Sequence, residues 1–370
     1  MSNRMVTDNQ RIAWVDILRF LGMTLIYWGH LGVSDNITLY IFAHHVPLFF
    51  FISGFFAGLS PAEGSFFRFL WKKIRSLVFP YIFFTILYYA VQLIMGEMVF
   101  RDLPKALLVS AEGIRNQAPG PLWFFTCLFV IVIAFELIKR ICSAIFGRGK
   151  AGGVLAFLLA VVLFVVGICF LGHEPAQDPR WIWNVDSACV YIFYYALGAL
   201  LFPLINRWKY NRRSGAGKFF FFLCFGLSVL FAVFTCFRGA AFTETVRSFL
   251  SKLLPGNIFG GALFEIYALV SALILIFMEL CIARIISLIP AIGRFLAYVG
   301  KDSLYHCGNE LIIKYFGRIA LFTLGLNVVF QNDLLLLLYS IVCLIVLTFT
   351  LNLLERLVLG PLFGTGRFRK

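Results

Sequence analysis

The sequence predicts an all-α, polytopic integral membrane protein with about ten transmembrane helices. Of its 370 residues, 61% are hydrophobic and 14% are charged, whereas soluble domains carry about 25% charged residues. The hydrophobic residues gather in long runs, each close to the ~20 residues that an α-helix needs to cross a bilayer. The expected spans are residues 12–32, 40–59, 77–96, 121–138, 153–171, 188–206, 219–237, 258–283, 303–325 and 333–355.

The distribution of positive charge predicts how these spans are oriented. With the N-terminus in the cytoplasm, the cytoplasmic segments hold 22 lysines and arginines and the outside loops hold 7. Cytoplasmic loops of membrane proteins carry such an excess, so we expect both termini to be cytoplasmic. The formal net charge of +14 then reflects topology, and we expect no nucleic-acid partner.

The sequence contains no soluble domain, low-complexity linker or internal repeat, and we expect one transmembrane domain over residues 1–370. Its polar N-terminal segment lacks the small-residue cleavage site of a secretory signal peptide. The nine cysteines lie mostly within apolar runs, without the spacing of a disulfide framework or a zinc site. We therefore interpret them as small packing residues.

The first span, residues 12–32, carries Asp16, Arg19 and His30 on an otherwise apolar helix. With Tyr27 they fall within about 80° of one another around the helix, forming one polar stripe. A charged side chain near the centre of a membrane helix costs roughly 2.5–3.5 kcal/mol. The stripe either docks this helix against its neighbours or serves a function, which is the default interpretation of ionisable groups in a membrane.

The second span begins near two adjacent histidines, His44 and His45, and holds Ser53 deeper. Adjacent histidines on a helix point to different sides, so we expect no metal cluster here. His45 either helps to bind a substrate or caps the helix. Gly54 and Gly58 form a small-xxx-small spacing that permits close helix contact.

Three further groups of polar residues are candidates for function. Lys72, Lys73 and Arg75 follow the second span, and are either positive-inside flanks or ligands for an anion. Glu310, Lys314 and Arg318 share one face of the ninth span, as a buried ion-pair ladder or as the wall of a substrate cavity; the role of the nearby His306 stays open. The outside loop 172–187 carries acids and tryptophans, which favour an interfacial aromatic belt over a sugar contact.

Two of these spans carry motifs of a known family. Arg19 is followed after ten residues by His30, and Phe50-Phe51-Ile52-Ser53-Gly54 follows in the second span. This pairing resembles the membrane acyltransferase-3 family, and the finer likeness is to sugar O-acetylases related to fucose acetylases. Residues 72–75 are similar to the family's Arg-x-x-Arg motif with lysine in first place. The sharpest motifs lie in residues 11–81, and Gly120-Pro121-Leu122-Trp123-Phe124 also looks like the family.

The resemblance implies an O-acyltransferase of a bacterial-type plasma (inner) membrane. The donor would be cytosolic acyl-CoA, with acetyl-CoA as the expected co-substrate and no bound cofactor. The acceptor would be a hydroxyl of a cell-envelope or extracytoplasmic sugar or polysaccharide. Such a donor carries phosphates, which a cationic patch on the cytosolic side can bind.

The same resemblance assigns roles to individual residues. His30 is the expected general base, although an acyl-histidine intermediate is also open. Asp16 would pair with Arg19 and orient it. At about 21 Å along the helix, Asp16 is too far from His30 to be its direct partner. Arg19 lies about 16 Å from His30, comparable with an extended pantetheine arm. Donor phosphates are assigned to Lys72, Lys73, Arg75 and Arg19, and acceptor binding or structural support to His45, Ser53, Trp123 and Glu310.

Two other functional classes remain open on the sequence alone. A membrane transporter or flippase for a glycan or anionic substrate would also have many spans and an ionisable stripe. A catalytically silent scaffold would need His30 only for stability. The pairing of the two motifs favours the enzyme, while the oligomeric state, the acceptor and the acyl group are left undetermined.

Overall fold

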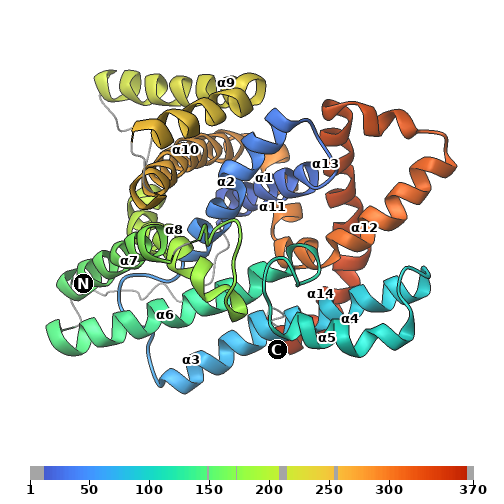
Figure 1. The fold of residues 1–370 in the computed structure, drawn as a ribbon, viewed down its shortest axis with the longest axis horizontal. Helices are drawn as coiled ribbons and strands as arrows, with labels where there is room; N and C mark the ends of the chain where they lie inside the picture. Colours follow the sequence, from blue (N-terminus) through green and yellow to red (C-terminus); the bar gives the residue numbers. More distant parts are fainter. Residues whose placement is uncertain (1–11, 148–149, 172, 208–214, 254–256, 365–370) are drawn as a thin grey trace.

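The chain folds into a bundle of α-helices packed around a long apolar core (Figure 1). The computed structural model describes residues 12–147, 150–171, 173–207, 215–253 and 257–364, and within these ranges no β-strand occurs. The helices in chain order are α1 (Ala13–Gly29), α2 (Asp35–Gly54), α3 (Phe66–Lys73), α4 (Phe79–Ile94), α5 (Leu103–Ala111), α6 (Trp123–Phe146), α7 (Lys150–Phe170), α8 (Val185–Arg207), α9 (Gly215–Leu253), α10 (Asn257–Ile286), α11 (Pro290–Gly300), α12 (Ser303–Thr323), α13 (Asp333–Phe349) and α14 (Leu351–Phe363).

The prediction of an all-α, multi-pass membrane protein is confirmed. Within the described residues, seven helical segments are long and apolar enough to cross a membrane, or eight if the pair α13–α14 is one span bent by 48°. The 17-residue α1 and the charged α12 are not among them. The count of ten spans therefore stays a prediction. The two ends of the chain, and several basic residues used to predict orientation, lie outside the described residues.

Helix α1 occupies the centre of the bundle (Figure 1). It packs against α2, α10, α11, α12 and α13, and 13 of its 17 residues are buried. Asp16, in the first turn of this helix, is only 4% exposed. The first span is therefore a core helix rather than a lipid-facing one, and its polar stripe is turned toward neighbouring helices.

Two glycines allow α2 and α8 to touch backbone to backbone. A Cβ atom on Gly54 would collide with the carbonyl oxygen of Tyr195, and one on Gly198 would collide with that of Phe51. The prediction that Gly54 permits close helix contact is confirmed. The same prediction for Gly58 is wrong, because Gly58 lies beyond the end of α2, has φ +61° and has no neighbour within 4 Å of a built Cβ.

The second and third spans differ in their bounds from the prediction. Helix α2 begins at Asp35 rather than at residue 40, and Pro47 lies inside it. Helix α3 begins at Phe66 and continues through a π-helical turn, Ile74–Val78, into α4. The basic residues that follow the second span therefore lie on helical turns. Single π-helical turns occur frequently at functional sites.

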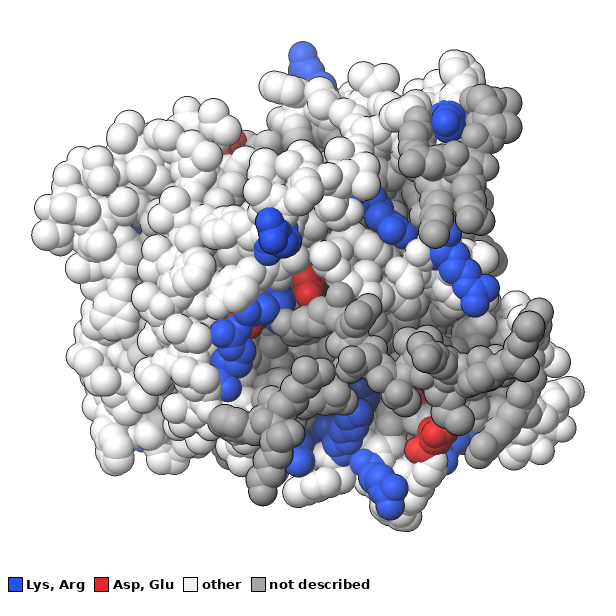
Figure 2. Space-filling view, turned by 180° about the vertical axis from the view of Figure 1, so that it is seen from behind, with Lys and Arg blue, Asp and Glu red and all other residues white. Residues whose placement is uncertain are grey.

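The surface has the charge distribution of a membrane protein. Figure 2 shows wide areas without charged side chains, and the lysines and arginines visible on this face lie mainly in its middle and lower parts. Large apolar side chains are exposed on many helices, such as Ile86 on α4, Leu230 on α9 and Val270 on α10. Lipid tails can cover such a surface without a hydrophobic penalty.

The close contact between α2 and α8 leads to a stability prediction. Gly54→Ala should destabilise the protein by about 1–3 kcal/mol, because the added methyl group forces the two backbones apart. Gly226→Ala on α9 is the matched control, since nothing lies within 4 Å of its built Cβ and alanine favours helix. Thermal unfolding in detergent measures both, and equal melting temperatures would contradict the contact.

Candidate active site

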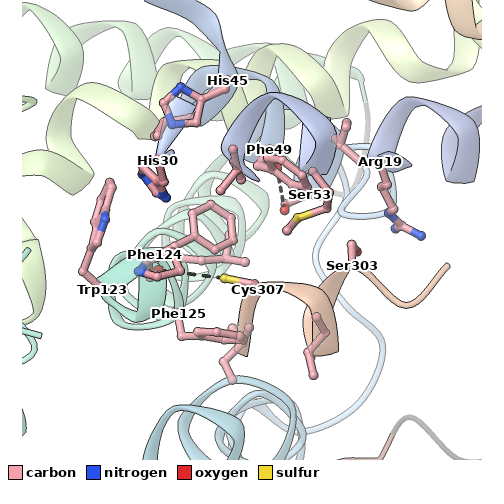
Figure 3. A pocket seen from close by; sticks show the side chains of 18 of the residues that line it. Arg19, His30, His45, Phe49, Ser53, Trp123, Phe124, Phe125, Ser303 and Cys307 are labelled. Carbon is pink, nitrogen blue, oxygen red and sulfur yellow. Dashed lines mark hydrogen bonds between the residues drawn. The ribbon is translucent and has the colours of Figure 1, made fainter. Parts of the chain in front are cut away.

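A narrow cavity of about 190 Å³ runs between α1, α2, α6 and α12. Arg19 and His30 lie at its two ends, with aromatic and aliphatic side chains between them (Figure 3). Phe49 from α2 and Phe124 from α6 are among these side chains. A largely apolar space that reaches from Arg19 to His30 can accept an extended chain.

His30 ends helix α1 and is held by a buried carboxylate of α12. Its Nδ1 lies 2.8 Å from Oε1 of Glu310. The side chain of Glu310 is 0% exposed, whereas that of His30 is 27% exposed. Glu310, which the sequence assigned to acceptor binding or structural support, is the direct partner of His30, a pairing that the sequence did not predict.

This hydrogen bond fixes the protonation pattern of the imidazole ring. A carboxylate accepts, so Nδ1 of His30 carries the hydrogen that is shared with Glu310. In the neutral ring, Nε2 then holds the basic lone pair. A histidine oriented by a carboxylate, at the wall of a cavity, is the arrangement that a general base requires.

Lys314 shares the same carboxylate. Its Nζ lies 3.4 Å from Oε1 of Glu310, one helical turn away. The predicted pair of Glu310 with Lys314 is confirmed, but the ladder does not continue, because the guanidinium of Arg318 lies 5.6 Å from the ring of Phe330 instead. The ammonium group of Lys314 and the Nδ1–H of His30 offset the cost of burying the charge of Glu310.

Asp16 and Arg19 form the predicted pair at the other end of the cavity. Nη1 of Arg19 donates to Oδ1 of Asp16 at 2.7 Å. The guanidinium also lies 5.9 Å from the ring of Phe56. The pair is far from His30, as the helix spacing predicted, and it sets the direction of Arg19 at the cavity mouth.

His45 lies beside His30 on the wall of the cavity. The two rings are 6.5 Å apart and edge-on, and Nδ1 of His45 lies 2.9 Å from the carbonyl oxygen of Ile41. The interpretation of His45 as a helix cap is wrong, because α2 begins ten residues earlier. His44 faces away, toward Glu279 of α10 at 3.9 Å, as expected for adjacent histidines on a helix.

Ser53 and Trp123 also line the cavity. The hydroxyl of Ser53 donates to the carbonyl oxygen of Phe49 at 2.7 Å, within its own helix. The indole of Trp123 lies 4.8 Å from the guanidinium of Arg115. Arg115 lines the cavity as well, and the sequence analysis counted it only as an outside-loop charge, because its spacing links it to no motif.

The basic residues of the third helical segment differ from one another in their surroundings. Arg75 donates from Nε to the carbonyl oxygen of Leu362 at 3.1 Å, and from Nη2 to that of Pro361 at 2.5 Å. It therefore fastens the end of α14. Lys72 is exposed, and the Nζ of Lys73 lies 5.4 Å from the ring of Phe69.

His306 belongs to a buried polar network rather than to the cavity. Asn352 donates to its Nδ1 at 3.0 Å, and its Nε2 faces the carbonyl oxygen of Val299 at 3.2 Å. Tyr27 donates to the carbonyl oxygen of His306 at 2.7 Å. These bonds tie α12 to α1 and to the bend between α13 and α14. Within the described residues, no group of three metal-binding side chains occurs.

The pairing of Asp16 with Arg19 leads to a prediction on stability. Asp16→Asn removes the charge that faces a largely buried guanidinium, and we expect a loss of about 1–3 kcal/mol. The double variant Asp16→Asn/Arg19→Gln should recover part of this loss, because it removes both charges and leaves no unpaired guanidinium. Unfolding of the wild type, of Asp16→Asn, of Arg19→Gln and of the double variant in detergent tests this; additive losses of the two single variants would contradict the coupling.

Comparison with known proteins agrees with this geometry. The model of the acyltransferase-3 family, described as an acyltransferase domain, matches residues 12–354. No curated protein and no solved structure matches the chain. The matched region contains both ends of the cavity, the basic helical turns and Glu310. The chain therefore belongs to the acyltransferase-3 family of membrane acyltransferases.

Proposed function

We propose that this acyltransferase moves an acyl group, with acetyl as the expected one, from acyl-CoA to a sugar hydroxyl. The observation that carries this proposal is the cavity that joins Arg19 to His30, where His30 is bonded to the buried Glu310. The donor would be cytosolic, and the acceptor a cell-envelope or extracytoplasmic sugar or polysaccharide. The enzyme would reside in a bacterial-type plasma membrane, with no bound cofactor.

The length of the cavity supports a threaded thioester. Arg19 and His30 are separated by 11 residues of α1, or about 16 Å. An extended pantetheine arm could enter beside Arg19 and bring its thioester to His30. The cavity's apolar walls suit such an arm.

The nucleotide part of the donor would remain at the cavity mouth. Arg19 stands there, and Lys72 and Lys73 precede the π-helical turn whose Leu77 lines the cavity. Ammonium and guanidinium groups bind phosphate oxygens through charge-assisted hydrogen bonds. Arg75 plays a smaller part in this proposal than the sequence suggested, because it already donates to two carbonyl groups of α14.

The proposed chemistry uses His30 as general base. Nε2 of His30 takes the proton of the acceptor hydroxyl while its oxygen forms a bond to the thioester carbonyl carbon. The tetrahedral intermediate collapses, the carbon–sulfur bond breaks, and the imidazolium returns the proton to the departing thiolate. Glu310 stabilises the imidazolium through Nδ1 and holds the ring in one orientation, as the carboxylate of a catalytic triad does.

The decisive experiment follows radiolabelled acetyl-CoA with purified protein in nanodiscs and a panel of envelope glycans. His30→Ala should lower the rate of acetyl transfer by 10²-fold or more, with donor binding retained. His44→Gln is the matched control, because His44 faces Glu279 of α10 and does not line the cavity. Transfer by His30→Ala at the wild-type rate would overturn the proposal, and absence of acetyl-CoA binding would favour a transporter.

The role of Glu310 gives a second kinetic prediction. Glu310→Gln keeps the shape of the side chain but removes the charge that stabilises the imidazolium. We expect kcat to fall by about 10²–10⁴-fold while KM for acetyl-CoA changes little. Lys314→Gln, which leaves the bond from Glu310 to His30 in place, should lower kcat far less. Equal losses of kcat in the two variants would show that Glu310 has a structural role only.

The donor patch gives a third prediction. The double variant Lys72→Ala/Lys73→Ala should raise KM for acetyl-CoA about tenfold, since each lost charge-assisted hydrogen bond is worth about 1.5–3 kcal/mol before solvent screening. Its effect on the KM for the acceptor should be small. Arg294→Ala, which removes an exposed cation on α11, is the control. A similar rise of KM for acetyl-CoA in the control would show that the effect comes from overall charge and not from a phosphate site at Lys72 and Lys73.

A further inference from the structure

A second, larger cavity of about 660 Å³ adjoins the first at the His30 end. It lies between α2, α8, α9 and α10, and we call it the outer chamber. Phe42, His45, Val46 and Arg115 line both cavities. The ring of His30 is 5.8 Å from that of Phe42, at this junction. A ligand in the outer chamber would therefore reach His30 from the side opposite to Arg19.

The walls of the outer chamber combine aromatic rings with hydroxyl groups. The rings come from α8, α9 and α10, and the hydroxyl and amide groups stand between them. These lining residues include Tyr191, Tyr194, Tyr267, Thr235, Thr243 and Gln177. Flat apolar surfaces with a few placed polar groups are typical of small-molecule sites, whose usual volume is about 300–1,000 Å³.

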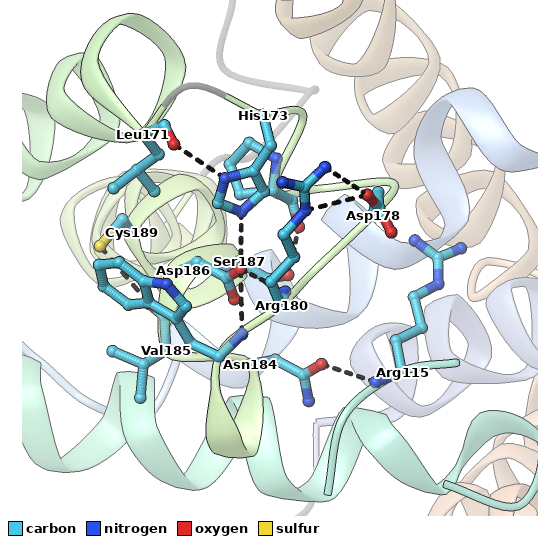
Figure 4. Close-up of polar contacts among 12 residues, drawn as sticks. Arg115, Leu171, His173, Asp178, Arg180, Asn184, Val185, Asp186, Ser187 and Cys189 are labelled. Carbon is cyan, nitrogen blue, oxygen red and sulfur yellow. Dashed lines mark hydrogen bonds and ion pairs between the residues drawn. The ribbon is translucent and has the colours of Figure 1, made fainter. Parts of the chain in front are cut away.

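One wall is a loop held in place by buried hydrogen bonds (Figure 4). Oδ2 of Asp186 accepts from the backbone N–H of Arg180 at 2.6 Å and lies 2.8 Å from Nε2 of His173. Nη1 of Arg115 donates to the carbonyl oxygen of Ala176 at 2.5 Å, and Ala176 lines the chamber. The acids and histidine of this loop thus build a wall that exists before any ligand binds.

The opposite wall carries a carboxylate within a membrane span. Glu265 lies on α10, in the segment Gly261–Ile286 that is apolar enough to cross a membrane, and its side chain lines the chamber. Within the described part of the chain, neither an ion pair nor a hydrogen bond is found for it. Ionisable residues inside membrane spans are costly and mark substrate sites. Asp35 adds a second acid at the rim.

We propose that the outer chamber is the acceptor site and that it selects an uncharged, hydroxyl-rich sugar. The rings of the chamber would pack against the sugar face, and Glu265 would accept hydrogen bonds from its hydroxyls. A carboxylate or phosphate on the sugar would meet the two acids Glu265 and Asp35, whereas the guanidinium of Arg115 on the same wall already donates to the carbonyl oxygen of Ala176. This balance of charge disfavours acidic sugars. This inference rests on the proposed function, because the sugar hydroxyl nearest to His30 is the one that would be acylated.

The chamber is tested by blocking it without touching the donor cavity. Ala268 lines the outer chamber, whereas Val270, two residues along α10, is 49% exposed on the outer surface. Ala268→Trp should abolish binding of methyl β-D-glucopyranoside to the full-length protein in nanodiscs, seen by saturation-transfer difference NMR. Val270→Trp should bind it as the wild type does. Binding of acetyl-CoA should be the same in all three proteins.

The predicted preference for an uncharged sugar is tested with two charged sugars, glucuronic acid and glucosamine. Glucuronic acid should bind at least tenfold more weakly than the neutral glycoside, and Glu265→Gln should narrow that gap. Preferential binding of glucuronic acid or glucosamine, undiminished sugar binding in Ala268→Trp, or no sugar binding at all would each overturn the inference. Displacement of the probe by phospholipid alone would assign the chamber to a lipid and overturn it too.

The two proposals fail in distinguishable ways. If the neutral glycoside binds in the chamber but no His30-dependent acetyl transfer is found, the chamber is a site for neutral sugars, and both the transfer reaction and the acceptor role of the chamber fall. If His30-dependent transfer is found and Ala268→Trp transfers with wild-type KM for the acceptor, the acyltransferase stands and the chamber is not its acceptor site. A rise of at least tenfold in that KM, absent in Val270→Trp, supports both.

Discussion

Glu310 is fully buried between helices, and the two groups that contact its carboxylate determine how the centre of the bundle is built. Oε1 of this carboxylate contacts His30 at the end of α1 and Lys314 on its own helix. A buried carboxylate without partners costs several kcal/mol, so α1 and α12 are held in one relative position. The same contact places an oriented imidazole where two cavities meet. The stability of the bundle and its proposed chemistry therefore depend on one interaction.

The position of α1 links this charge pair to the close packing of the other helices. Asp16 lies near the start of α1 and His30 at its end, so both polar ends of the helix face protein rather than lipid. Gly300 lets α11 touch the backbone of α1 beside Asp16, and Gly54 lets α2 touch α8. Close contact between helices narrows the space between them. The cavity from Arg19 to His30 is the space that remains between them.

The two cavities divide the proposed reaction between opposite ends of α1. Arg19 marks the end where a phosphate-bearing donor would enter, while Arg115 and His45 stand where the narrow cavity opens into the outer chamber. A donor and an acceptor that approach from opposite ends need no shared entrance. This arrangement would let an enzyme join a substrate on one side of a membrane to one on the other without moving either across. A transporter, in contrast, would need a path that opens alternately to each side.

The sequence by itself determined the all-α class, the membrane class, the family and the local pair of Asp16 with Arg19. These follow from composition, the 3.6-residue period and contacts three or four positions apart, which a linear pattern records. Only the tertiary structure showed that His30 contacts Glu310, 280 positions away. It also showed that Arg75 donates to two carbonyl groups of α14 and that His45 lies on a cavity wall rather than at a helix end. It also placed Gly58 outside the helix contact. Such outcomes depend on which helix faces meet across the bundle, and the spacing of residues along one helix does not encode its neighbours.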